Sequence, residues 1–185
     1  MLTHHPSARH HAPPFLVALA LSLAPAGTSH ASAECIGIFD SRAVAYAFFW
    51  SDAGSRNRDA LVADVRIAKA AGDTAGLKRA EQAIRDYDGR THLAVFSTAP
   101  ADDALAALGE RLDAIMREAG VTRLISRWDT TALAACAEVT RIDVTDRLVA
   151  PFHLAPARLR TIDELLRHEP VPLERARALW HAGRL

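Results

Sequence analysis

The sequence predicts an α+β protein with a small three-stranded sheet, a projecting antiparallel helical hairpin and a C-terminal helical extension. Three observations predict this fold. β-Favouring runs occupy residues 35–40, 121–128 and 137–144. A long stretch rich in alanine and charged residues, with apolar side chains at helical spacing, separates the first run from the second. Two brief amphipathic segments follow the third run, and Pro170 and Pro172 divide them.

The first 33 residues have the features of a cleaved signal peptide. A polar segment with Arg9 precedes the apolar run 15–24, and Ala31-Ser32-Ala33 forms an A-x-A cleavage signal. The run is shorter than the roughly 20 residues that span a bilayer. We therefore expect cleavage after Ala33, a periplasmic location, and a mature chain of 152 residues, which is 185 less 33.

The composition of the mature chain excludes two classes of protein. Arg9 is the one charged residue removed with the signal, so 21 basic and 22 acidic residues remain. This balance excludes a polycation built to hold nucleic acid. No later apolar stretch approaches membrane length, which argues against an integral membrane protein. We expect one domain over 34–150 and a helical extension over 151–185.

The helical arm is expected over about 42–119. Asp40 or Ser41 ends the first strand and caps a helix that continues to about residue 71. Gly54 interrupts this helix at a cost of only about 1 kcal/mol. A turn at Gly72 starts a return limb at 74, which Pro100 ends. A further helix is expected over 101–119.

The second and third strands follow Gly120, with a turn at 129–131 between them. A short helix over 146–150 and the two helices of the extension complete the chain. Cys35 and Cys136 would both lie at strand beginnings, and an even number of cysteines in an oxidising compartment permits a disulfide. Two unrelated small apolar residues are the alternative, and the sequence leaves both interpretations open.

Two blocks of the sequence resemble the Skp/OmpH family of periplasmic chaperones. They are CIGIFDSRAVA, a strand entering a helix, and AGVTRLISRWDTTALAACAEVTRIDVTDRLV, which contains Asp143-Val144-Thr145-Asp146-Arg147-Leu148. The chain resembles a divergent member with a shortened arm. The resemblance implies that the last two strands form a hairpin. It also implies a homotrimer with a shared β-body, and an ATP-independent holdase whose arms enclose unfolded outer-membrane proteins.

Residues capable of catalysis are present but lack a catalytic pattern. Asp40 with Ser41, and Asp143 with Asp146, are interpreted as helix caps and turns, and Asp102-Asp103 as the acidic first turn of a helix. Histidines 92, 153, 168 and 181 include no i, i+4 pair. We therefore expect no enzyme activity, no metal and no cofactor. Two alternatives remain: a structural or adaptor envelope protein, and a small secreted hydrolase or ligand-binding domain using the carboxylates of Asp40, Asp143 and Asp146.

The most unusual local feature is the aromatic cluster Tyr46, Phe48, Phe49 and Trp50. Four large aromatic side chains within five residues cannot all face one side of a helix. They are interpreted either as core residues that pack against the segment 159–166, or as a client-binding surface or subunit interface.

Overall fold

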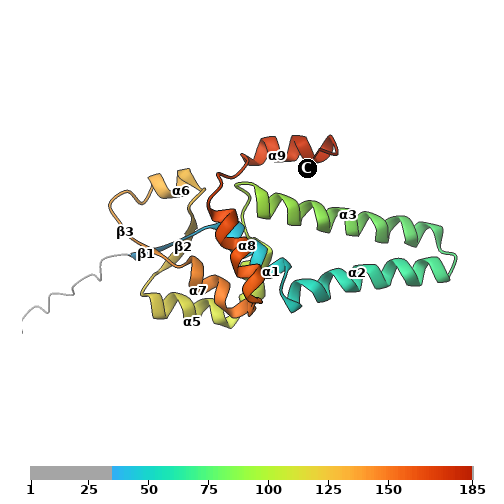
Figure 1. Ribbon diagram of the computed structural model, residues 1–185, viewed down its shortest axis with the longest axis horizontal. Helices are drawn as coiled ribbons and strands as arrows, with labels where there is room; N and C mark the ends of the chain where they lie inside the picture. The colour runs from blue at the N-terminus through green and yellow to red at the C-terminus, as the bar shows by residue number, and fades with distance from the viewer. Residues whose placement is uncertain (1–34, 185) are drawn as a thin grey trace, which may run out of the picture. The chain divides into compact units, whose positions relative to one another are not determined.

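The computed structural model describes residues 35–184 and shows an α+β fold. The predicted signal peptide lies outside these residues. The elements, drawn in Figure 1, are β1 Cys35–Phe39, α1 Ser41–Phe49, α2 Asp52–Ala70, α3 Thr74–Phe96, α4 Asp102–Leu108, α5 Glu110–Ala119, β2 Arg123–Ser126, α6 Thr130–Ala134, β3 Thr140–Asp143, α7 Thr145–Val149, the 3₁₀ turn η1 Ala150–Phe152, α8 Pro156–Leu166 and α9 Leu173–His181. The three strands fall within the three runs that the sequence predicts.

The sheet has the order β2-β1-β3, and both outer strands run parallel to β1. Gly37 of β1 is the register partner of Leu124 on one side and of Ile142 on the other. The predicted hairpin of the last two strands is therefore wrong. Parallel neighbours need a crossover connection of a dozen or more residues, and the segment between β2 and β3, which contains α6, crosses to the far side of β1.

Each face of the sheet has its own apolar cluster because successive strand side chains point to opposite faces. Ile36 and Ile38 pack with Cys136 and residues of α6 on one face. Phe39 belongs to the larger cluster on the other face, with α1 and α7. Gly37 permits close packing on this second face, because a Cβ there would lie 2.7 Å from the Leu124 side chain.

Helix α1 is buried along its whole length and ends at an elbow. The sequence predicts one helix from 42 to about 71, but the chain breaks at Trp50 and Ser51. Ser51 caps α2 by accepting a hydrogen bond from the Gly54 N–H. A Cβ on Gly54 would lie 2.3 Å from the Phe48 carbonyl oxygen. This glycine therefore allows the start of α2 to pack against the end of α1, which its modest helix penalty did not suggest.

Helices α2 and α3 form the helical pair that the sequence predicts. They lie side by side and antiparallel, and reach away from the sheet (Figure 1). Gly72 turns the chain between them with φ of 66°, and Asp73 caps α3. The arm, as we call this pair from here on, covers 52–96 rather than 42–119, since α1, α4 and α5 pack in or beside the core.

The segment 101–119 contains two helices instead of the expected one. Gly109 has φ of 52° and separates α4 from α5, because a positive φ cannot continue a right-handed helix. The two helices of the extension form as expected. Helix α8 packs against α1, and α9 packs against α3.

Within the described residues, no helix is both long enough and apolar enough to cross a membrane.

Candidate functional site

One of the acidic residues that the sequence singled out lies at the carboxyl end of the central strand. Asp40 follows β1 and is fully buried. Its carboxylate caps α1 by accepting a hydrogen bond from the Arg42 backbone N–H at 2.9 Å. The same carboxylate accepts side-chain hydrogen bonds from Arg42 and from the Trp128 indole, at 2.9 Å to Arg42 Nη2 and 3.2 Å to Trp128 Nε1. The Asp40 backbone N–H donates to the Thr145 hydroxyl at 3.0 Å.

Arg42 connects this buried carboxylate to the C-terminal extension. Its guanidinium is 2 % exposed and donates from Nη1 to the His168 carbonyl oxygen at 2.6 Å. It also lies over the Trp128 ring, 4.9 Å from the ring centroid. A planar guanidinium suits this combination of ion pair, hydrogen bond and ring stacking. The Asp40–Arg42 ion pair therefore joins β1, the loop after β2, the start of α7 and the residues just after α8.

The electrostatics of Asp40 indicate a structural role. Burial alone would raise the pKa of its carboxyl group, but the hydrogen bonds and charge of Arg42, with the Trp128 hydrogen bond, outweigh burial and hold the pKa below its ordinary value of 3.8. A general acid or base near neutral pH needs the opposite shift. With its oxygens occupied by protein donors, Asp40 is a cap and an anchor, and the cap interpretation is confirmed.

The other two carboxylates of the hydrolase alternative have different surroundings from Asp40. Asp143 accepts a hydrogen bond from Arg127 Nη2 at 2.6 Å and one from the Thr145 backbone N–H at 2.9 Å. Asp146 is exposed in the first turn of α7. Across residues 35–184, no group of three or more His, Cys, Asp or Glu side chains is arranged to hold a metal ion.

Three of the four clustered aromatic residues lie in the core of their own chain. Tyr46, Phe48 and Phe49 are 5 %, 3 % and 9 % exposed. Phe48 contacts Phe152 and Phe49 packs edge-on against Tyr87, so elements that follow α1 in the chain cover these side chains. Trp50 differs: it is 36 % exposed and stacks on Tyr46 with the ring centroids 4.5 Å apart. Trp50 is thus the member of the cluster with surface left for a partner.

The two cysteines are free thiols in the structure. Cys136 is buried in the small apolar cluster with Ile36 and Ile125, beside Arg123. Cys35 is partly exposed at the start of β1, where it is the register partner of Thr140.

The arm has apolar surface that is incompletely covered. Between residues 55 and 86 no described residue is fully buried. The apolar side chains of the seam between α2 and α3 are only partly covered, among them Leu61, Val62, Val65, Leu77 and Ile84. Ile67 near the tip is 66 % exposed. It borders a hollow of 400 Å³ between the two helices.

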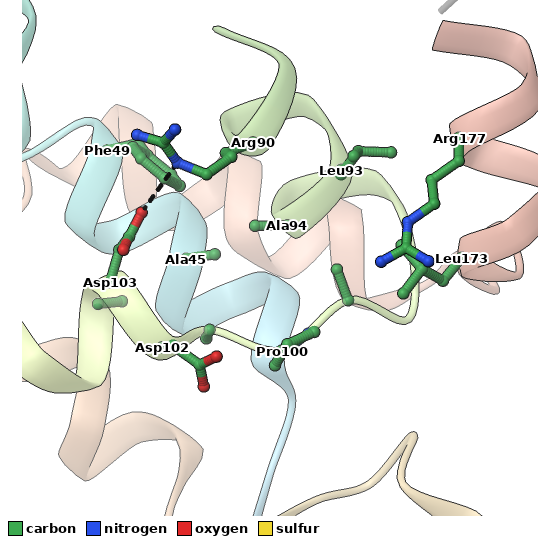
Figure 2. Close-up of a pocket in the computed structure, with 13 residues that line it drawn as sticks. Ala45, Phe49, Arg90, Leu93, Ala94, Pro100, Asp102, Asp103, Leu173 and Arg177 are labelled. Atoms are coloured by element: carbon green, nitrogen blue, oxygen red, sulfur yellow. Dashed lines mark ion pairs between the residues drawn. The ribbon is translucent and has the colours of Figure 1, made fainter. Parts of the chain in front are cut away.

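A second hollow lies at the base of the arm, where α1, α3, the chain before α4 and α9 meet (Figure 2). It has a volume of 240 Å³ and a mostly apolar lining with arginines at its margin. The sequence does not predict this hollow. Its walls come from three segments that are far apart in the chain, and alanines form much of its floor, so no motif marks it.

Comparisons of the chain with models of protein families, with curated proteins and with solved structures find no match.

Proposed function

We propose that this protein is a non-catalytic, ATP-independent holdase that binds apolar segments of unfolded proteins along its α2–α3 arm. The observation that carries the proposal is the lack of any fully buried residue from 55 to 86, although apolar side chains line the seam of the arm. Two helices alone cannot cover such a seam on all sides. A polypeptide laid along it would remove further apolar area from water, at about 25 cal/mol per Å².

The surface of the arm suits weak binding of many sequences better than tight binding of one. Its ion pairs are exposed and long: Arg58–Asp88 at 3.5 Å and Arg79–Asp73 at 3.9 Å. Pairs of this kind contribute little and rearrange readily. Alanines and Gly76 line the tip hollow beside the exposed Ile67, with charged side chains among them, and the small residues leave room for apolar side chains of different shapes. Adaptable surfaces of this type are typical of promiscuous binders.

We further propose unfolded outer-membrane proteins as the clients, the periplasm as the location and a homotrimer as the working assembly. The export signal in the sequence and the resemblance to Skp/OmpH chaperones support this finer proposal. Association of several arms around a common axis would leave the apolar seams facing a shared space, where a client could bind.

The decisive experiment is a light-scattering mass measurement of residues 34–185, alone and mixed with a denatured outer-membrane β-barrel protein. The proposal expects a particle of three chains that keeps the client soluble. A monomer beside an aggregated client would contradict the holdase function. A monomer that keeps the client soluble would contradict the trimer and leave the binding activity standing.

A single substitution tests whether the arm carries the binding. Ile67→Ser removes the most exposed apolar side chain of the arm, so client affinity should fall about fivefold, roughly 1 kcal/mol for the partial burial of one aliphatic side chain. Fluorescence anisotropy of a labelled unfolded client measures this affinity. The unfolding midpoint should hardly change, because Ile67 is 66 % exposed.

Arg66→Ser is the matched control. It truncates the neighbouring exposed side chain to the same residue and leaves the lining of the tip hollow intact. Equal loss of affinity in both variants would place the binding surface elsewhere than on the apolar seam.

A further inference from the structure

The hollow at the base of the arm is a separate feature from the seam. Its floor consists of small side chains between α1, α3 and the segment that leads into α4. Phe49, Leu93 and Leu173 form its apolar walls (Figure 2). The alanines that leave the space open are Ala45, Ala94, Ala99, Ala101 and Ala104. Since the cavity has a volume of 240 Å³ and one of about 150 Å³ holds benzene, it offers room for roughly ten non-hydrogen atoms.

Two guanidinium groups stand at the margin of this hollow. Arg177 on α9 extends toward it beside Leu173, and Arg90 on α3 lies at the opposite end over Phe49 (Figure 2). Asp103 is engaged with Arg90 at 3.6 Å. The Asp102 carboxylate points away from both guanidinium groups (Figure 2). The end of the hollow at Arg177 is therefore the place where a negative charge is favoured.

The present partner of Arg177 is replaceable. Its guanidinium contacts Glu174 at 2.8 Å, and the two side chains are 51 % and 83 % exposed. An ion pair this exposed is worth about 0–1 kcal/mol. A carboxylate held over an apolar floor can exchange with Glu174 at this guanidinium, because arginine offers several N–H donors that suit a carboxylate.

We propose that this hollow binds a small organic monocarboxylate with an apolar body. The carboxylate contacts Arg177, and the aryl or short alkyl body lies over Ala94 and Ala45 toward Phe49. The apolar floor supplies affinity by burial, and Arg177 supplies the selectivity for an acid over its neutral analogue. The site is independent of client binding along the arm, because its lining shares no residue with the seam.

Two probes of equal shape test the proposal on the full chain. They are 3-phenylpropanoate and its neutral amide, each followed by two-dimensional NMR of the backbone amides. The acid should shift resonances of residues 45–49, 93–104 and 173–177, and the amide should bind about tenfold more weakly, for the loss of one charge-assisted interaction. Equal binding of acid and amide, or shifts of other residues, would overturn the proposal.

Two variants and a control locate the site. Arg177→Gln should remove the advantage of the acid over the amide, while Arg175→Gln, an exposed change on the same helix outside the hollow, should keep it. Ala94→Leu should fill the floor and abolish binding of both probes. Because Arg177 is half exposed, its variant tests the proposal even if the core substitution at Ala94 prevents folding. Acid selectivity that survives Arg177→Gln would refute the assignment.

Discussion

The sheet with the helices packed on it, here called the body, and the arm both contain arginine–aspartate ion pairs, but the pairs have different roles in the two regions. In the body, Arg42 and Asp40 are 2.9 Å apart and almost completely buried, with Trp128, Thr145 and the His168 carbonyl completing their hydrogen bonds. In the arm, Arg58 and Asp88 are 3.5 Å apart with 53 % and 37 % of their side chains exposed. The first pair fixes how four segments meet. The second keeps an open surface soluble while adding little free energy. The two pairs have the same residue types, so their different contributions to stability come from the difference in burial.

The largest expected effect comes from breaking the buried pair. Asp40→Ala leaves the Arg42 guanidinium buried without its carboxylate, so the free energy of unfolding should fall by about 3–5 kcal/mol. Urea denaturation of the natural protein and of the Asp40→Ala variant measures this difference in the free energy of unfolding. Asp88→Ala in the arm is the matched control and should cost less than about 1 kcal/mol. Comparable losses in both variants would remove the distinction between the two regions.

Lowering the pH should have a smaller effect on stability than removing the Asp40 side chain. The pKa of Asp40 is lowered in the folded protein, so its contribution to stability is complete above its ordinary value of 3.8 and is lost as the pH falls through the lowered folded-state value. The side-chain carboxyl ¹³C resonance of Asp40 should therefore titrate with a midpoint below 3.8. A midpoint at or above that value would mean that burial dominates and that Arg42 does not compensate for it.

The smallest effect tests how the extension joins the base of the arm. Gly89 lies inside α3, where alanine is normally favoured by about 1 kcal/mol. A Cβ there would lie 2.9 Å from the Trp180 ring, which also contacts His92. Gly89→Ala should therefore give no gain in stability in the natural chain.

The same substitution in a Trp180→Ala background should raise the free energy of unfolding by about 1 kcal/mol, because the helix preference then acts alone. Thermal or urea denaturation of the natural protein, the two single variants and the double variant gives the four free energies of this double-mutant cycle. A gain of equal size in both backgrounds would show that α9 is not seated on α3 in solution.

Local patterns predicted the elements well and their partners poorly. The three strand positions, the break before Pro100 and the cap at Asp40 follow from residue preferences over a few neighbours. The parallel order β2-β1-β3 does not, since it depends on where α6 takes the chain. Gly54 looked like a small helix penalty and is instead a site of close helix contact.

The candidate sites were harder to predict for the same reason. Tyr46, Phe48 and Phe49 could be assigned to the core only after the elements that cover α1 were known. Arg42 carried no signal, because in an arginine-rich chain one more arginine suggests an exposed helix face. Its burial depends on Trp128 and on the end of α8, which are distant in the sequence.

The central position of β1 has a consequence for the order of events during synthesis. β1 is the earliest described element to leave the ribosome, yet its partners on both sides come much later, and the Asp40–Thr145 hydrogen bond spans 105 residues. Contacts this distant in the chain form slowly, because the intervening loop must close first. The contacts between α2 and α3 are close in the chain, so the arm can fold as it emerges, before α9 follows and packs against α3. Each new molecule therefore passes through a stage in which a finished arm accompanies an unpaired apolar strand.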